Sequence, residues 1–237
     1  MPKATISDSL VYEDADYLVL NKPPGLATLE DRSDPRNLLS LVREFEPRAQ
    51  MGHRLDKETS GVLIVARHPE AYRHISMQFE GRHVRKVYHA VVHGIHRFNH
   101  LEVNRAIQIQ KDGTVRLANA GKSAQTFFDT LEVYQQHSLL QCEPITGRMH
   151  QIRIHAASVK APLVSDSTYG GNPIYLADLK PGFKLKKGTE AEPLIKRVAL
   201  HAYAVEFQLL DGSVKQIEAT YPKDFRALVN QLRRQTR

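Results

Sequence analysis

Residues 53–61, His-Arg-Leu-Asp-Lys-Glu-Thr-Ser-Gly, contain the side chains of this sequence that are best suited to chemistry. They lead directly into the apolar run 62–66, and loops positioned by a rigid strand often carry catalytic groups. Arg54 and Lys57 lie beside Asp56, and nearby cations favour the ionised form of a carboxylate. An ionised carboxylate can act as a nucleophile or as a base. Asp56 is therefore a candidate catalytic residue, although a surface turn with solvated charges is the commoner origin of such a run.

A second basic cluster lies around Arg148 and Arg153. Apolar residues recur at helical spacing behind it, which predicts a short helix over residues 150–159. The two arginines, together with His155, are expected on adjacent sides of this helix. Gly147 near its start would leave backbone N–H groups available to an anion. A solvated basic helix face is the alternative interpretation.

The sequence indicates neither a metal site nor a nucleotide cofactor. His150 and His155 are not the i, i+4 pair that a zinc protease places on a helix. The chain has 12 histidines but a single cysteine, Cys142, which excludes a multi-cysteine metal site and an internal disulfide. The glycine motifs that cradle phosphates and the Gly-x-Ser-x-Gly elbow of serine hydrolases do not occur in the sequence.

The chain is basic, with a formal net charge of +7 and a pI of about 9.5. Lysines and arginines suit a polyanionic partner, because they release counterions when they neutralise phosphates. A mildly basic protein without such a partner is the alternative. No apolar stretch reaches transmembrane length, and the first residues lack the apolar region of a signal peptide. We therefore expect a cytoplasmic protein with no membrane partner.

The predicted elements indicate an α+β fold. Residues 62–66 are typical of a strand buried on both faces, Pro69 opens a helix, and Asp224 can cap a last helix. Because strands outnumber helices and short turns join many of them, we expect a mixed, largely antiparallel sheet with flanking helices. No linker divides residues 1–237, which are expected to form a single domain with an irregular basic loop at about 176–197. The other predicted strands lie at 10–12, 17–20, 86–92, 124–133 and 198–209.

Residues 53–61 resemble the hallmark motif of the RluA family of pseudouridine synthases. Five further segments agree with that family, in the family's order, and together they span about residues 10–222. They are 21–26 (Asn-Lys-Pro-Pro-Gly-Leu), 86–88 (Lys-Val-Tyr), 121–126 (Gly-Lys-Ser-Ala-Gln-Thr), 146–155 (Thr-Gly-Arg-Met-His-Gln-Ile-Arg-Ile-His) and 200–202 (Leu-His-Ala).

The resemblance implies a pseudouridine synthase catalytic domain, with a curved mixed sheet in two sub-lobes and a basic cleft between them. Met149 departs from the family's usual Thr or Ser, and Val164-Ser165-Asp166 replaces its usual Leu-Gly-Asp. We expect neither departure to touch the chemistry. The S4 RNA-binding domain that precedes many relatives is expected to be missing. The catalytic domain itself would then grip RNA, with the loop at 176–197 as a candidate contact.

By position, the resemblance makes Asp56 the catalytic aspartate. It implies that Tyr88 lies against the target base and that Arg153 pairs with Asp56. Arg54 would hold the flipped-out nucleotide or its vacated stack, and Leu200 would form an apolar wall of the pocket. The remaining residues assigned to substrate binding are His53, Arg148 and His150.

The implied reaction isomerises uridine to pseudouridine in structured RNA, either ribosomal or transfer RNA. It needs no cofactor, and we expect a monomer. Asp56 could attack C1′ or remove the C2′ proton, and the sequence leaves both routes open. A non-catalytic RNA-binding protein is one rival, against which the retention of Asp56, Tyr88 and Arg153 argues. An RNA N-glycosidase is another, but glycosidases use two carboxylates that flank the bond.

Overall fold

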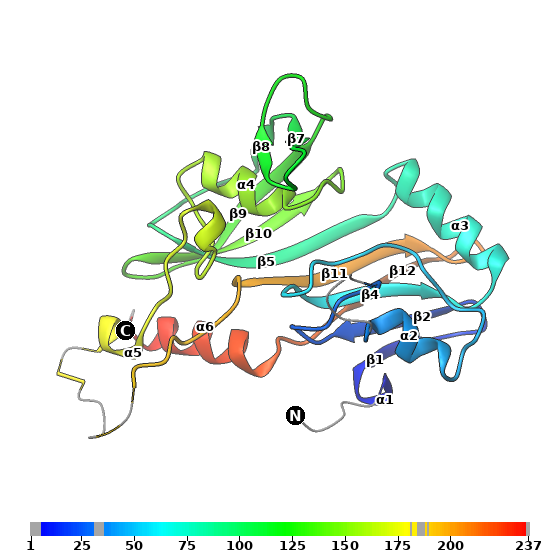
Figure 1. Ribbon diagram of the computed structural model, residues 1–237, viewed down its shortest axis with the longest axis horizontal. Helices are drawn as coiled ribbons and strands as arrows, with labels where there is room; N and C mark the ends of the chain where they lie inside the picture. The colour runs from blue at the N-terminus through cyan, green and yellow to red at the C-terminus, as the bar shows by residue number, and fades with distance from the viewer. Residues whose placement is uncertain (1–5, 31–35, 181, 184–187, 189, 236–237) are drawn as a thin grey trace. The chain divides into compact units, whose positions relative to one another are not determined.

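The computed structural model describes residues 6–30, 36–180, 182–183, 188 and 190–235. It divides the chain into two compact units (Figure 1). Unit 1 consists of Met1–Val87 and His201–Pro222, and unit 2 consists of Tyr88–Leu200 and Lys223–Arg237. Each unit is therefore built from two segments that lie far apart in the sequence.

Unit 1 contains a mixed sheet with the strand order β1-β2-β4-β11. β2 and β4 are antiparallel, β4 and β11 are parallel, and β3 and β12 add to β4 and β11. Helix α3 packs against β3 and β4. The elements are α1 (Ile6–Ser9), β1 (Leu10–Glu13), β2 (Tyr17–Lys22), α2 (Leu38–Arg43), β3 (Gln50–Met51), β4 (Ser60–Ala66), α3 (Pro69–Glu80), β11 (Leu200–Gln208) and β12 (Val214–Glu218).

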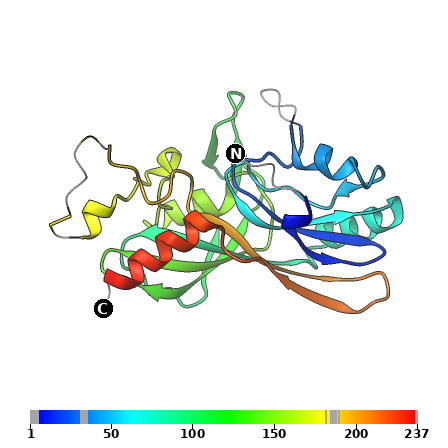
Figure 2. The ribbon, with the colours of Figure 1, turned by 90° about the horizontal axis from the view of Figure 1, so that it is seen from below.

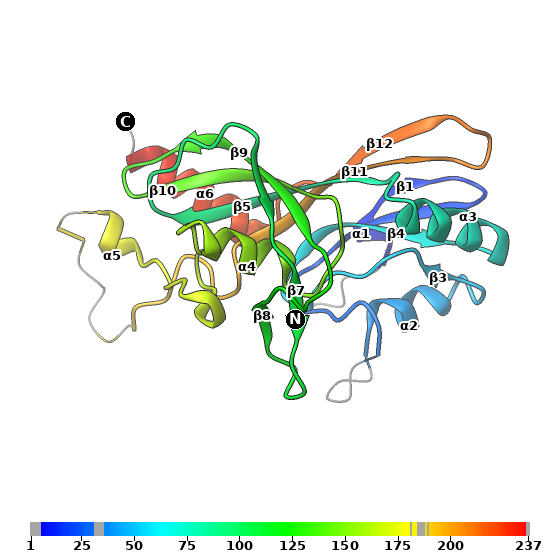
Figure 3. The ribbon, with the colours of Figure 1, turned by 90° about the horizontal axis from the view of Figure 1, so that it is seen from above.

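Unit 2 contains an antiparallel sheet with the order β5-β10-β9-β6 and a separate hairpin of β7 and β8. Helix α4 lies on one face of this sheet and α6 on the other (Figures 1 and 3). Figure 2 shows α6 lying along the strands. The elements are β5 (Arg85–His93), β6 (Leu101–Asn104), β7 (Ile107–Ile109), β8 (Val115–Leu117), β9 (Gln125–Val133), β10 (His137–Pro144), α4 (Gln151–Ser158), η1 (Ser167–Tyr169), α5 (Leu176–Leu179) and α6 (Lys223–Gln235).

The predicted α+β class with a mixed, largely antiparallel sheet is confirmed. All residues of β4 are buried, as its continuous apolar run predicts. Helix α3 begins at Pro69, and the side chain of His68 caps it by accepting the N–H of Ala71 at 3.3 Å. The last helix, α6, buries the apolar stripe predicted for it: Phe225, Leu228, Val229 and Leu232.

Gly61 is required where β4 and β11 run parallel, because the two backbones approach closely there. It pairs with Ala202 and has a φ of +116°, a conformation that L side chains rarely adopt. A Cβ at this position would lie 2.0 Å from the carbonyl oxygen of Ala202. The glycine that ends the 53–61 motif therefore serves strand packing.

The prediction that Asp224 precedes and caps the last helix is wrong. Asp224 lies inside α6, which begins at Lys223, and its carboxylate accepts hydrogen bonds from Arg197 at 2.7 and 3.1 Å. Arg197 is 8% exposed and also donates to the carbonyl oxygens of Val198 and Leu200. These bonds compensate for the burial of the charge, since a buried charge is tolerated when it is paired and hydrogen-bonded. Arg197 is therefore a buried structural cation.

Truncating the core of unit 2 is expected to lower the free energy of unfolding strongly. Phe128 is fully buried in a cluster with Ala90 and Leu140, so Phe128→Ala should cost about 3–5 kcal/mol. Phe45, which is 52% exposed, provides the control, and Phe45→Ala should stay within about 0.5 kcal/mol. Urea unfolding measures both variants, and equal losses would contradict this packing.

Candidate active site

The loop that carries Asp56 connects β3 to β4 in unit 1. Asp56 is half-buried, and its main-chain oxygen accepts the N–H of Thr59 at 3.0 Å, which closes a turn. Lys57 and Glu58 are exposed on this turn, whereas Thr59 and the strand that follows are buried. The carboxyl-bearing residue therefore stands on a short turn at the start of a rigid, fully buried strand.

A buried hydrogen-bond relay anchors the strand directly behind this loop. His201 Nε2 lies 3.1 Å from the carbonyl oxygen of Ala219, which can only accept, so Nε2 carries the proton. Nδ1 then accepts the hydroxyl of Ser60 at 2.9 Å. Since Ser60 and His201 are both fully buried, the relay ties the start of β4 to β11. The Ser60 of the 53–61 motif therefore has a positional role.

His53 is a neutral acceptor that supports the same loop. Its Nε2 accepts the N–H of Ile64 at 3.1 Å, and its ring lies 4.8 Å from that of Phe79. Burial, together with the charge of Lys86, lowers the pKa of His53 to about 3. A substrate contact by His53 stays a prediction, and it would have to use the Nδ1 edge because Nε2 is engaged.

Lys86, whose charge acts on His53, is not among the site residues that the sequence predicted. Burial and the charge of Arg82 lower its pKa to about 8. A lysine with this pKa is only partly protonated in mildly alkaline solution. Its place in the Lys-Val-Tyr segment immediately before Tyr88 was visible in the sequence, but its perturbed charge depends on burial, which composition does not reveal.

The guanidinium of Arg153 is held by Asp166 in unit 2. Nε and Nη2 of Arg153 donate to the two carboxylate oxygens of Asp166, each at 2.7 Å. The Asp166 side chain is fully buried and that of Arg153 is 10% exposed. A bidentate pair fixes the plane of a guanidinium, so Asp166 orients Arg153. Asp166 is the residue of the 164–166 segment that keeps the family pattern, and the expectation that the two departures beside it leave the chemistry untouched stays a prediction. The pairing of Arg153 with Asp56 also stays a prediction.

Tyr169 joins two of the predicted site residues. Its ring centroid lies 5.1 Å from Cζ of Arg153, a cation–π contact, and its hydroxyl lies 3.0 Å from Nδ1 of His150. His150 adopts a left-handed conformation, with a φ of 54°, immediately before α4. Tyr169 was not predicted, because its partners lie about 20 residues earlier in the chain and no local pattern connects them.

Ser165 adopts a backbone conformation that is unusual for a residue other than glycine. Its φ is +61°, in the left-handed region that glycine tolerates best. The Ser165 hydroxyl donates to the carbonyl oxygen of Ile195 at 2.8 Å. This bond supports the turn that presents Asp166 to Arg153.

Arg148 does not lie on the predicted helix, because α4 begins at Gln151. The Gln151 side-chain oxygen accepts the N–H of Arg148 at 3.0 Å and the hydroxyl of Thr146 at 2.7 Å. The N–H of Arg148, which was predicted to be available to an anion near Gly147, is therefore already bonded to the Gln151 side chain. Arg148 is half-buried, and its Nε donates to the carbonyl oxygen of Ser123 at 3.1 Å.

His155 belongs to the interior of unit 2, so the alternative of a solvated basic helix face is wrong for it. It is fully buried; its Nε2 donates to the carbonyl oxygen of Arg105, and its Nδ1 accepts the hydroxyl of Thr126, each at 2.9 Å. Burial lowers the pKa of this imidazole. His155 thus repeats the arrangement of Ser60 and His201 in unit 1.

Tyr88 and Leu200 share one apolar cluster of unit 2. Leu200 and Ile152 are buried in this cluster, and Tyr88, half-buried on β5, packs against it. The structure thus brings together Tyr88 with Leu200, and Arg153 with His150 through Tyr169, within unit 2. It places Asp56, His53 and the exposed Arg54 in unit 1.

Residues 16–158 match the family model described as RNA pseudouridylate synthase. The chain belongs to this family. The resemblance to the RluA family is confirmed by curated relatives named as ribosomal large subunit pseudouridine synthases C and D.

Three of these relatives indicate how much of the chain is matched. Synthase C of Salmonella typhi is 33% identical over 239 residues, covering 97% of this chain and 72% of that protein. Synthase D of Neisseria meningitidis serogroup B is 37% identical over 237 residues, covering 94% and 61%. Synthase C of Vibrio parahaemolyticus is 36% identical over 171 residues, covering 70% and 54%. The chain thus spans between about half and about seven-tenths of the length of these relatives.

Two solved structures of the family share the fold. Human RNA Pseudouridylate Synthase Domain Containing 4 gives a TM-score of 0.73 at 22% identity, with 96% of this chain and 94% of that chain covered. Human RNA Pseudouridylate Synthase Domain Containing 1 gives a TM-score of 0.68 at 26% identity, with 90% and 83% covered.

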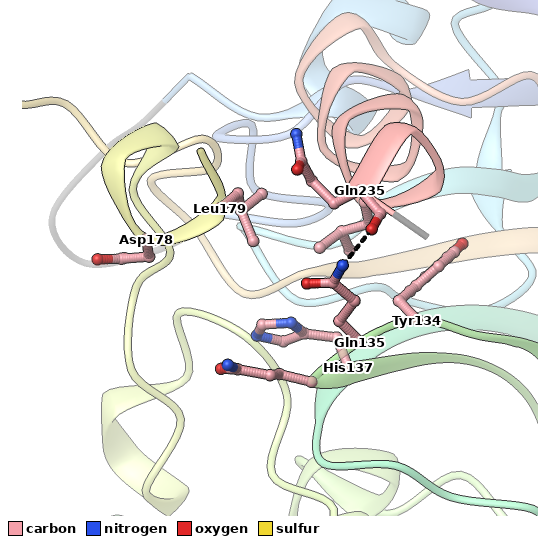
Figure 4. A pocket seen from close by; sticks show the side chains of 8 residues that line it. Tyr134, Gln135, His137, Asp178, Leu179 and Gln235 are labelled. Atoms are coloured by element: carbon pink, nitrogen blue, oxygen red, sulfur yellow. Dashed lines mark hydrogen bonds between the residues drawn. The ribbon is translucent and has the colours of Figure 1, made fainter. Parts of the chain in front are cut away.

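A small pocket in unit 2 lies away from the family motifs. It is lined by Tyr134, His137, Asp178, Leu179 and Gln235, among others, and the amide of Gln135 donates to the main chain of Gln235 beside it (Figure 4). Burial, followed by the charge of His93, lowers the pKa of His137 to about 4. None of the predicted site residues lines this pocket.

Within the described part of the chain, no group of three or more His, Cys, Asp or Glu side chains could hold a metal ion. No helix among the same residues is both long and apolar enough to cross a membrane.

The predicted basic loop at 176–197 is only partly described. Lys184, Lys186 and Lys187 lie outside the described residues. Lys196 forms an exposed ion pair with Glu192 at 2.8 Å. The role of this loop in RNA binding stays a prediction.

Breaking the buried ion pair that orients Arg153 is expected to destabilise the protein. Asp166→Asn leaves a buried guanidinium without its charged partner and should lower the free energy of unfolding by about 3–5 kcal/mol. Glu192→Gln removes one partner of an exposed pair and should change it by less than about 1 kcal/mol. Urea unfolding compares the two variants, and similar small losses would count against the buried pair.

Acid is expected to weaken the folded state through His53. The unfolded imidazole titrates near 6.5, whereas the folded one takes up its proton only at about pH 3. The unfolded state therefore binds more protons between these values, so stability falls as pH drops from 6.5, by at most about 1.4 kcal/mol per pH unit.

His53→Gln tests this pH dependence, because glutamine can accept the Ile64 N–H but does not titrate. Other buried histidines are present in both proteins and cancel in the comparison. The free energy of unfolding is measured by urea at pH 7.5 and pH 5 for both proteins. From pH 7.5 to pH 5 the wild type should lose more stability than the variant, so the wild-type minus variant difference should become smaller. A difference that does not change with pH would contradict the assignment of a neutral His53.

Proposed function

We propose that this chain is an RNA pseudouridine synthase that isomerises specific uridines in ribosomal or transfer RNA, with Asp56 as its catalytic carboxylate. The observation that carries the proposal is an aspartate in a His-Arg-Leu-Asp motif, half-buried on a turn at the start of a buried strand, in a chain of this family. The relatives named as ribosomal large subunit synthases favour ribosomal RNA as the substrate.

The reaction rearranges one nucleotide without oxidation or reduction. The N1–C1′ bond breaks, the uracil turns, and C5 bonds to C1′. The hydrogen on C5 then leaves as a proton, and N1 gains a proton. No electrons enter or leave, so the chain's own acids, bases and binding contacts suffice and no cofactor is required.

Asp56 has two possible roles in breaking the N1–C1′ bond. As a nucleophile it would form an ester with C1′, which C5 of the turned uracil then displaces. As a base it would remove the C2′ proton and give a glycal, to which C5 adds as the proton returns. Both roles require an ionised carboxylate, and Arg153 is proposed as the cation that stabilises it.

The target base must leave its stack before either route can begin. Extrusion costs a few kcal/mol in a duplex and less in a loop. In the proposal Tyr88 recovers about 1–3 kcal/mol by stacking on the base, and Leu200, from the same apolar cluster, closes the pocket. Arg54, exposed on the Asp56 loop, occupies the vacated stack or holds the flipped nucleotide.

RNA binding in this proposal rests on charge and on a few motif residues. The net charge of +7 favours a polyanion, and Arg148, His150 and the basic loop at 176–197 add local contacts in the proposal. We propose that the enzyme acts as a monomer and, because its substrates are ribosomal or transfer RNA, in the cytoplasm.

Asp56→Asn is expected to abolish turnover and to leave RNA affinity within about threefold, because the amide keeps the size of the side chain but loses its charge and basicity. The measurement is tritium release from cellular RNA labelled at C5 of uridine and isolated from a strain that lacks the gene. Release reports the reaction directly, since the new C5–C1′ bond expels the C5 hydrogen.

Glu58→Gln is the matched control, because it neutralises an exposed carboxylate two residues away on the same turn. It should keep the wild-type rate. Turnover by Asp56→Asn at the native rate would refute the assignment of Asp56. RNA binding without release by the wild-type protein would favour a binding protein, and release of free uracil would favour an N-glycosidase.

A further inference from the structure

The hydroxyl of Thr28 closes both backbone hydrogen bonds of the residue that precedes Asp56. It donates to the carbonyl oxygen of Leu55 at 2.8 Å and accepts the N–H of Leu55 at 3.1 Å. A threonine hydroxyl offers one donor and two acceptor lone pairs, so a single side chain serves both groups. Thr28 is 3% exposed and Leu55 is 4% exposed, so water does not provide an alternative partner for these groups.

The residue that follows Asp56 is held from the same direction. The carbonyl oxygen of Lys57 accepts the N–H of Gly25 at 2.8 Å and the ammonium of Lys22 at 3.2 Å. Lys22 is fully buried, and its ammonium also donates to the carbonyl oxygens of Pro23 and Leu26 at 3.0 and 2.9 Å. The segment 22–28 therefore grips the backbone on both sides of Asp56.

The segment that supplies Thr28 is itself fixed within unit 1. The N–H groups of Leu38 and Leu39 at the start of α2 donate to the carbonyl oxygens of Ala27 and Thr28, at 2.8 and 3.2 Å. α2 is closed by a capping box in which Asn37 and Ser40 bond to one another. Thr28 is therefore held in place by α2, and its hydrogen bonds to Leu55 in turn hold the loop that carries Asp56.

We propose that Thr28 is a positioning residue for Asp56, acting through the backbone of Leu55, with Lys22 and Gly25 completing a clamp on the other side. The proposal rests on the proposed function, because it assigns Thr28 to the catalytic step. Fixing the peptide groups on both sides of Asp56 restricts its backbone torsions and so aims the carboxylate. Small misplacements of a catalytic group can cost about 100-fold in rate.

The test compares three substitutions by tritium release from C5-labelled RNA. Thr28→Val keeps the size of the side chain and removes the hydroxyl, whereas Thr28→Ser keeps the hydroxyl and removes the methyl group. Thr130→Val is the matched control in unit 2, because the Thr130 hydroxyl also accepts a backbone N–H, that of Phe98, at 2.8 Å. The rate is expressed per molecule competent to bind RNA, obtained from the stoichiometry of RNA binding.

Thr28→Val should lower kcat about 10- to 100-fold with KM within about threefold, because the proposed binding residues of unit 2 are untouched while the catalytic carboxylate loses its fixed position. Thr28→Ser and Thr130→Val should stay within about threefold of wild type. The ratio of wild-type to Thr28→Val kcat should also be constant over temperatures below the unfolding transition. A partly unfolded variant would instead show a ratio that grows with temperature.

Other outcomes are equally decisive. A wild-type kcat for Thr28→Val, or equal losses for Thr28→Val and Thr28→Ser, would overturn the positioning role while leaving the proposed function standing. If Thr28→Val does not fold, Thr28→Ala and Thr28→Ser decide, since both lose the methyl group and only alanine loses the hydroxyl. Absence of release by the wild-type protein would refute the proposed function itself, and the positioning role with it.

Discussion

The parallel approach of β4 and β11 at Gly61 is the constraint on which the Asp56 loop depends. The two backbones come so close that a Cβ on residue 61 would lie 2.0 Å from the carbonyl oxygen of Ala202. The buried hydrogen bond between Ser60 and His201 joins the two strands at the neighbouring pair of residues. The C-terminal end of the loop is thereby fixed by a strand 141 residues away in sequence. Since Asp56 stands only four residues before Ser60, little conformational freedom remains between them.

Hydrogen bonds from side chains to the main chain immobilise the motif segments of both units. In unit 1 the Thr28 hydroxyl and the Lys22 ammonium take up main-chain groups beside Asp56. In unit 2 the side chain of Gln151 takes up the N–H of Arg148, and His155 donates to a main-chain carbonyl oxygen. Buried polar groups are costly unless they are bonded, so each of these side chains is held in one geometry. Residues of the motifs that touch no substrate in the proposal therefore still determine its geometry.

The charges of the proposed site follow the same logic. Asp166 neutralises Arg153 in a buried bidentate pair, and Tyr169 covers the guanidinium and reaches His150. A cation paired in this way stays at a fixed place without solvation by water, which suits the role proposed for Arg153. Asp166 therefore determines the orientation of Arg153 although it follows a departure from the family pattern.

The sequence by itself determined the α+β class, the buried strand β4, the helix that begins at Pro69 and the apolar face of α6, because these depend on local periodicity and chain-breaking residues. Its motifs also singled out Asp56 and Arg153. Only the tertiary structure decided that Arg153 forms an ion pair with Asp166, that His155 is buried, and that the Thr28 hydroxyl hydrogen-bonds to the backbone of Leu55. These facts concern which distant side chains become neighbours and lose water, and no local pattern of residues encodes such contacts.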